Sequence, residues 1–199
     1  MGNTVYEYFK LVRDYSFDED ESAVLKGEEL ENIIDSYDRR LHDYLIKIAR
    51  AGLSIMDSKK LSRDLDTIKD FERIGDHLNN IAGFFQDRYN SKEDLSEDGA
   101  NDLLEIYEVL DRMMINTLKA FENQDVKLAR TVIQDEDYVD ELERSLRYRY
   151  IERLKAQEVG FAPTYPDILA NLERIGDHLK NIASSVIEPL YVPQSMAKF

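Results

Sequence analysis

The chain has 199 residues, 43% of them hydrophobic and 34% charged, enough for one large domain or two of about 100 residues each, with a packed core. Its formal net charge of −15 argues against nucleic acid as a partner, because the surface would repel phosphate backbones, and favours cations and basic protein surfaces. The sequence contains no cysteine, which excludes disulfides, thiolate metal sites and a cysteine nucleophile.

The chain is rich in strong helix formers and contains only 8 glycines and 4 prolines, which favours long helices over a sheet fold. The N-terminal segment lacks the apolar core of a signal peptide. No run of roughly 18 apolar residues occurs anywhere, so this chain does not itself span a membrane.

Taken in chain order, the sequence predicts helices over residues 3–15, 19–50 and 59–90, with Ser58 as the cap of the third. After a polar junction at Ser91–Glu97, three more are expected over 95–122, 125–157 and 166–188. Asp125 would cap the fifth, and the sixth would follow the loop Val159–Pro166, with Pro166 in its first turn. Pro189 and Pro193 would end it. We therefore predict an all-α fold of two tandem three-helix bundles, residues 1–90 and 91–199.

An internal repeat supports the division into halves. Residues 70–82 and 171–183 share 10 of 13 amino acids, including the segment ERIGDHL in both. Further upstream, Gly27–Asp38 aligns more faintly with Val132–Glu143. This alignment pairs Glu31 with Glu136 and Asp35 with Asp140. The first helix is shorter than its counterpart in the second half, from which we expect the chain to be part of a longer polypeptide.

Apolar residues of the repeated helix follow helical spacing. They form one stripe in each copy, which predicts the seam of a helical bundle: Phe71, Ile74, Leu78, Ile81 and Phe85, and Leu172, Ile175, Leu179, Ile182 and Val186. His77 and His178 lie off the acidic face described next and are predicted to be buried or interface histidines rather than ligands.

Each copy also carries an acidic pair, Glu72 with Asp76 and Glu173 with Asp177, that a helical projection places opposite the core beside Gly75 or Gly176. Like charges four residues apart destabilise a helix slightly, and a mid-helix glycine costs about 1 kcal/mol relative to alanine. Their repetition therefore suggests a bound cation as the compensating partner.

Antiparallel packing of the second and third helices of each half would bring the upstream acidic pairs to the repeated ones. The predicted metal ligands are Glu31, Asp35, Glu72, Asp76, Glu136, Asp140, Glu173 and Asp177. An all-oxygen ligand set suits magnesium, manganese, calcium or iron, and also admits zinc.

A carboxylate-bridged di-iron enzyme is the alternative in which these acids perform chemistry. That site requires Glu-x-x-His, yet the residues three positions before the histidines are Arg39, Ile74 and Ile175. The chain also lacks a phosphate-binding loop, a nucleophile elbow and the H-E-x-x-H motif. We therefore expect no enzyme. The third hypothesis, besides a metal-binding domain and a di-iron enzyme, is a metal-free helical interaction module.

The two ERIGDHxxNIA segments, each preceded by an acidic helix, resemble the PhoU family of phosphate-uptake regulators, and the resemblance covers nearly the whole chain. It implies two three-helix bundles related by pseudo-twofold symmetry. It also implies E/D-x-x-x-D motifs on two helices of each bundle that hold a surface metal cluster, often of iron or zinc.

By the same resemblance, the protein would restrain or modulate a phosphate transporter, or a linked sensor kinase, through protein contacts. It would be cytoplasmic and form a homodimer. The short first helix and the negative charge resemble PhoU-like domains at the C-terminus of sodium/phosphate cotransporters. In that version the partner is the membrane part of the same polypeptide, which tethers the domain to the inner face of the cell membrane.

Overall fold

The structure, a computed structural model, describes residues 1–92, 95–156 and 164–187, and these ranges contain six α-helices and no strand. The helices are α1 (Gly2–Tyr15), α2 (Glu21–Ala49), α3 (Ile55–Ser91), α4 (Glu97–Asn123), α5 (Val126–Ala156) and α6 (Tyr165–Ile187). Each lies within a few residues of its predicted range. No helix in the described ranges has the length and apolar character needed to cross a lipid bilayer.

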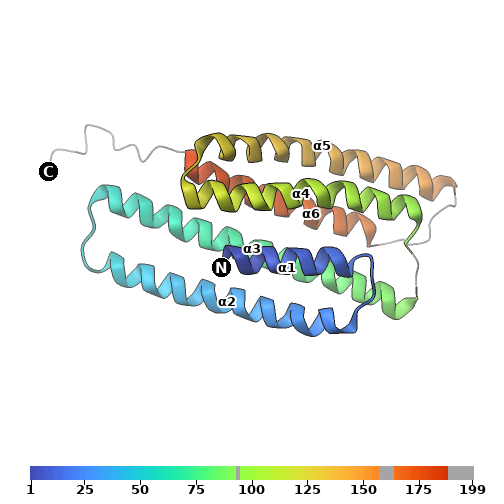
Figure 1. Cartoon of the computed structure of the whole chain (residues 1–199), viewed down its shortest axis with the longest axis horizontal. Coiled ribbons are helices and arrows are strands. Elements are labelled where there is room, and N and C mark those ends of the chain that lie inside the picture. The colour runs from blue at the N-terminus through green and yellow to red at the C-terminus, as the bar shows by residue number, and fades with distance from the viewer. Residues whose placement is uncertain (93–94, 157–163, 188–199) are drawn as a thin grey trace.

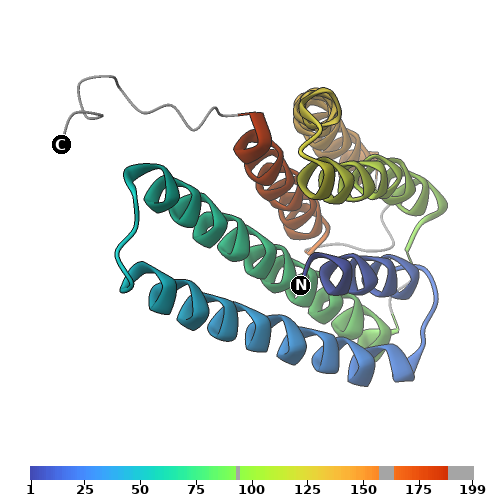
Figure 2. The same ribbon diagram turned by 60° about the vertical axis from the view of Figure 1, so that its left-hand side comes forward.

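The helices form two three-helix bundles that lie side by side (Figures 1 and 2). In the first bundle α2 and α3 run antiparallel with α1 against both, and α4, α5 and α6 repeat this arrangement in the second. The bundles meet where α3 packs on α6 and α1 packs on α4. The predicted all-α fold of two repeats is confirmed.

Local sequence explains where several helices begin. Asp125 caps α5 as predicted, because its carboxylate accepts hydrogen bonds from the backbone N–H groups of Lys127 and Leu128 at 2.9 and 3.1 Å. Pro166 lies in the first turn of α6. The prediction that Ser58 caps α3 is wrong.

The cap of α3 is Ser54, one turn earlier, where the Asp57 N–H donates to its Oγ at 3.1 Å and Ser54 Oγ donates to the Asp57 carboxylate at 2.7 Å. The first bond satisfies one backbone N–H of the first helical turn, and the second holds the Ser54 hydroxyl in place. Pro189, Pro193 and Val159–Pro163, which were predicted to end α6 or to precede it, lie outside the described residues.

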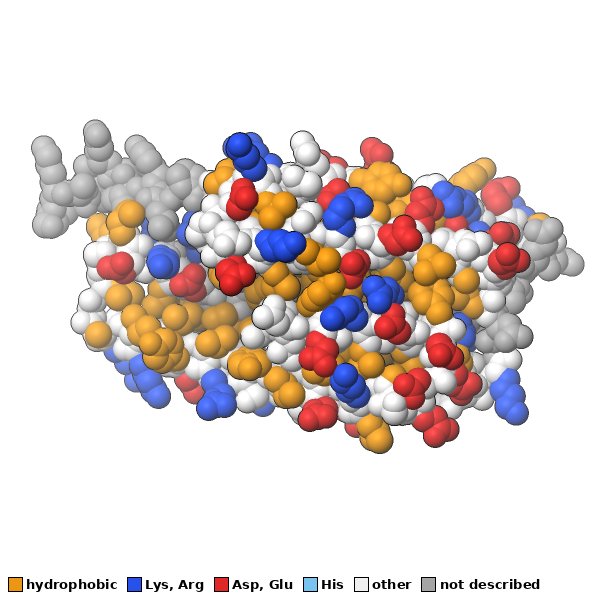
Figure 3. Space-filling view, in the orientation of Figure 1, with side chains coloured by type: hydrophobic (Ala, Val, Ile, Leu, Met, Phe, Trp, Pro, Cys, Tyr) orange, Lys and Arg blue, Asp and Glu red, His pale blue; other side chains and the backbone are white. Residues whose placement is uncertain are grey.

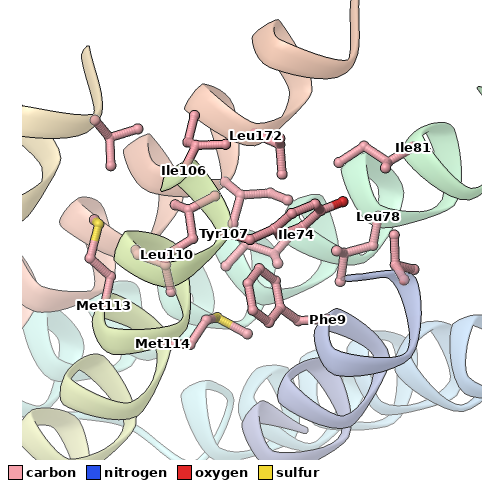
Figure 4. Packing of buried hydrophobic residues seen from close by; sticks show 14 of the residues in the cluster. Phe9, Ile74, Leu78, Ile81, Ile106, Tyr107, Leu110, Met113, Met114 and Leu172 are labelled. Carbon is pink, nitrogen blue, oxygen red and sulfur yellow. The ribbon is translucent and has the colours of Figure 1, made fainter. Parts of the chain in front are cut away.

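The predicted apolar stripes are buried in full, and one core runs through both bundles. Figure 4 shows Ile74 and Leu78 of the first bundle in the same buried cluster as Ile106, Leu110 and Leu172 of the second. Rings from both halves also meet: the Phe9 and Tyr107 ring centroids lie 5.8 Å apart, and Tyr107 Oη bonds Ser16 Oγ at 2.8 Å. The bundles therefore pack as one body.

Equivalent contacts in the two bundles fix the structural alignment of the repeats. A Cβ on Gly75 of α3 would lie 3.4 Å from Ile34 of α2, and a Cβ on Gly176 of α6 would lie 3.4 Å from Val139 of α5. Thus α2 corresponds to α5 with an offset of 105 residues and α3 to α6 with an offset of 101, as the sequence alignment predicts. The equivalent helices differ in length: α1 has 14 residues and α4 has 27, whereas α3 has 37 and α6 has 23.

Candidate functional site

Four predicted ligands of the first bundle face one another across the seam between two helices. Glu31 and Asp35 lie on α2, Glu72 and Asp76 lie on α3, and all four side chains are partly buried. Burial raises the pKa of the Glu31 carboxyl, and the charges of Asp35 and Asp76 raise it further. Burial also raises the pKa of Asp76, with Glu72 and Asp35 adding to the effect. We call these residues the α2/α3 cluster.

Within the described residues, basic side chains reach the α2/α3 cluster from its own two helices, and Arg39 Nη1 of α2 lies 3.8 Å from Asp35 Oδ2. Lys69 Nζ lies 2.7 Å from Glu72 Oε1, and Arg73 Nη1 lies 3.4 Å from Asp76 Oδ2. The second oxygen of Glu72, Oε2, is buried and accepts no hydrogen bond among the described residues, and Arg73 Nε lies 3.9 Å from it. A buried oxygen without a donor is a ligand position that a cation would satisfy.

The second bundle repeats the arrangement with Glu136 and Asp140 on α5 and Glu173 and Asp177 on α6, which we call the α5/α6 cluster. Burial raises the pKa of Glu173, and Asp177 and Asp140 raise it further. Glu136 is the most deeply buried ligand candidate, with 2% of its surface exposed. The antiparallel packing therefore brings the predicted pairs together in both halves.

One residue makes the clusters chemically different. Lys180 of α6 forms an ion pair with Glu136 and also lies 3.7 Å from Asp137. Burial raises the pKa of Glu136, the Lys180 ammonium lowers it, and Asp177 and Asp140 raise it. In the α2/α3 cluster the equivalent residue is Asn79, which carries no charge and accepts a hydrogen bond from Tyr8 Oη at 3.4 Å. The α5/α6 cluster therefore contains its own cation.

The orientation predicted for the acidic faces needs correction. The acidic pairs were predicted to lie opposite the core beside Gly75 and Gly176, but both glycines are buried against the neighbouring helix. The reason is that α3 and α6 each have neighbours on two sides, so the face opposite the main apolar stripe is also packed. The carboxylates lie at the edge of this second contact, and none of the eight is fully exposed.

The carboxylate oxygens of the α2/α3 cluster suit a hard or borderline cation. They are partly buried, they repel one another, and one of them accepts no hydrogen bond among the described residues. Within the described ranges, no three acidic or histidine side chains are drawn together closely enough to hold one ion as they stand. Ion binding at this seam therefore requires side-chain rotations that bring the two facing pairs together.

His77 and His178 lie at the seam between the bundles, as predicted. Their rings stack with centroids 5.5 Å apart. His77 Nδ1 hydrogen-bonds Asn171 at 2.9 Å, and His178 Nδ1 hydrogen-bonds Asp70 at 2.8 Å, so each histidine binds the first residue of the other copy of the repeat. Burial lowers the pKa of His77. Asp70 and Asn171 differ between the two copies of the repeat, and the sequence alone did not predict this reciprocal pairing.

Comparison with known proteins identifies a matching family and several relatives of this chain. The family model of the PhoU domain matches residues 1–84 and again 103–186. A Thermotoga maritima protein described as "Phosphate-specific transport system accessory protein PhoU homolog 1" is 28% identical over 170 residues, which cover 84% of this chain and 72% of that protein.

Two crystal structures share the fold. PhoU from Pseudomonas aeruginosa superposes with a TM-score of 0.85 at 24% identity, covering 94% of this chain and 90% of that one. The phosphate transport system regulatory protein PhoU from Streptococcus pneumoniae gives 0.64 at 21% identity, covering 93% and 90%. The double match of the family model, one to each bundle, shows that this chain belongs to the PhoU family.

Proposed function

We propose that this chain is a non-enzymatic regulatory domain that acts on phosphate transport through protein contacts. The observation that carries the proposal is the match of the PhoU domain to both repeats, together with the accessory and regulatory roles in the names of the relatives. The partner would be a phosphate transporter, in the same polypeptide or separate, or a sensor kinase linked to it. The domain would act at the cytoplasmic face of the cell membrane, as a homodimer or tethered through an upstream transporter.

Phosphate uptake in cells tests this role. Deleting the gene from its source organism should abolish the normal decrease in uptake of labelled phosphate when external phosphate is abundant. Restoring the wild-type gene should restore that response. Unchanged uptake and unchanged phosphate-dependent gene expression after deletion would contradict the proposal.

We further propose that the α2/α3 cluster binds iron, zinc, magnesium or manganese, with Glu31, Asp35, Glu72 and Asp76 as ligands. A bound ion would neutralise the repulsion among these acids and join α2 to α3. At the α5/α6 cluster, Glu136, Asp140, Glu173 and Asp177 form an equivalent set. There Lys180 competes with the ion for Glu136, so we expect weaker binding than at the first cluster.

Metal analysis of the purified protein, before and after chelation, tests the ligand assignment. An Asp76→Asn/Asp177→Asn double variant should lose bound metal. The matched control is Asp66→Asn/Asp167→Asn, which changes one exposed aspartate on each of the same two helices and should retain the metal. Wild-type protein that binds no metal would refute the proposal and leave the metal-free interaction module as the function of the acidic helices.

A further inference from the structure

A groove runs along the seam between α2 and α3, next to the α2/α3 cluster, and we call it the α2/α3 groove. Its narrow part, about 80 Å³, is lined by the C-terminal half of α1, by Gly27 and Glu28 of α2 and by Asn79 and Gly83 of α3. It opens into a wider part of about 310 Å³ at the start of α2 and the end of α3. Three residues line both parts and so join them: Tyr15, Val24 and Gln86.

Small residues of the first repeat leave the α2/α3 groove open. A Cβ on Gly83 would point into open space, with no contact within 4 Å. By the offset of 105 residues, Gly27 corresponds to Val132, which is fully buried. By the offset of 101, Gln86 corresponds to Ile187, which packs against the core. The chain's own apolar side chains therefore fill in one repeat a seam that stays hollow in the other.

The lining of the α2/α3 groove is apolar and acidic, and no basic side chain belongs to it among the described residues. Glu28 lies at the narrow part, and Glu19 and Glu21 lie at the wide part. Leu25 also lines the wide part and is 71% exposed. Figure 3 shows acidic side chains gathered over this end of the first bundle, the right-hand half of the lower bundle. A ligand complementary to this groove is positively charged and partly apolar.

A lysine already lies in the equivalent seam of the second bundle. Lys180, at the position of Asn79, forms an ion pair with Glu136 and lies 3.7 Å from Asp137. The seam of this fold therefore accommodates a lysine, whose methylene stem can lie on apolar side chains while its ammonium meets a carboxylate. In the first bundle Asn79 carries no charge, so a lysine at this seam would come from another molecule.

We propose that the α2/α3 groove binds a partner protein through a lysine that enters the narrow part and an apolar residue that packs against Leu25. The methylene stem of the lysine would lie along Gly83, and its ammonium would pair with Glu28. The identity of the partner rests on the proposed function. Short cytoplasmic loops of membrane proteins carry an excess of lysine and arginine, so the bound segment would be a cytoplasmic loop of the phosphate transporter.

A labelled amphipathic peptide of leucine, lysine and alanine is the probe, and the same peptide with glutamate in place of lysine is its reference. Fluorescence anisotropy against the full chain should show saturable binding of the lysine peptide alone. Glu28→Gln should weaken this binding by about threefold or more, because it removes the partner of the ammonium. Glu29→Gln is the matched control, since Glu29 is an exposed neighbour outside the groove, and should weaken binding by less than about twofold.

A second pair of variants tests insertion into the narrow part. Gly83→Leu should weaken peptide binding by about tenfold or more, because the new side chain fills that space. The fold should persist, since leucine favours a helix more than glycine does. Ser58→Leu is the control, which adds a leucine at an exposed position of the same helix outside the groove. Equal binding to wild type and Gly83→Leu, or equal losses in Glu28→Gln and Glu29→Gln, would overturn the proposal.

Other occupants give distinct results. A dimer that Gly83→Leu dissociates and Ser58→Leu does not would make the groove an interface between two copies, against the proposal. Peptide binding that appears only after removal of residues 188–199 would make that segment of the chain the occupant, also against it.

The role of the groove in cells is tested by the same variants. Gly83→Leu should reproduce the loss of phosphate-dependent control of uptake that gene deletion causes, and Ser58→Leu should not. Normal control in Gly83→Leu cells would overturn the proposal. Because the peptide assay uses purified protein and a designed probe, whereas gene deletion tests the proposed function, failure of one is distinguishable from failure of the other.

Discussion

Replacing Lys180 with methionine removes the cation from the α5/α6 cluster while keeping the aliphatic volume of the side chain. Glu136, 2% exposed, would then lose its ion-pair partner and keep the carboxyl groups of Asp177 and Asp140 beside it. Breaking a fully buried ion pair costs about 3–5 kcal/mol. Since 34% of the Lys180 side chain is exposed, solvent screening reduces our estimate to about 2–3 kcal/mol. For a chain of this size we expect the melting temperature to fall by roughly 5–10 °C.

Urea unfolding followed by circular dichroism near neutral pH, on metal-free protein, measures the effect. Lys69→Met is the matched control, because the Lys69 side chain is 50% exposed and its pair with Glu72 should contribute about 0–1 kcal/mol. Adding Glu136→Gln to Lys180→Met should restore at least half of the lost stability, since no buried charge would remain unpaired. A loss no larger than that of Lys69→Met, or a double variant as unstable as the single one, would refute the role of Lys180 as the internal cation.

Two further predictions concern other parts of the seams. Burial and neighbouring acids raise the pKa of Glu31 in the folded chain, so the stability of the metal-free protein should fall as pH rises through that pKa. Glu31→Gln should therefore be more stable than wild type near pH 7 by about 0.5 kcal/mol in urea unfolding, with the difference closing toward about pH 4; an equal difference at both pH values would contradict this. Asp70→Ala deprives His178 and Asn181 of a shared acceptor and should cost about 1–3 kcal/mol, against about 0.5 or less for the exposed Asp66→Ala. Equal losses for the two variants would show that the bonds across the bundle seam do not stabilise the fold.

Periodicity in the sequence was enough to predict the six helices and the buried stripes. Ile74 and Leu78 recur as Ile175 and Leu179 with helical spacing, and helical spacing is what packing in a bundle requires. The missed cap at Ser54 had a readable signal, a serine followed three residues later by Asp57 at the start of an amphipathic run. Ser58 offered a competing signal, and only the backbone geometry decides between them.

The interaction partners of the site residues were harder to predict. A helical projection of one helix shows one core face, so it could not reveal that Gly75 packs against Ile34 on a second neighbour. Lys180 was visible as a departure from Asn79, but its ion pair with Glu136 depends on the register between α5 and α6, which the faint upstream repeat alone does not determine. The bonds between His178 and Asp70 cross between bundles, and no local pattern encodes them.

We propose that the paired carboxylates of the two repeats bind a cation. The most direct test is to measure the melting temperature of chelated protein during a metal titration. A bound ion at about 100 times its dissociation constant stabilises the folded state by roughly 2.7 kcal/mol. We therefore expect the melting temperature to rise by about 5–10 °C with iron, zinc, manganese or magnesium. The rise should be lost in Asp76→Asn/Asp177→Asn and kept in Asp66→Asn/Asp167→Asn. No rise with any of these ions, or the same rise in both double variants, would contradict the claim.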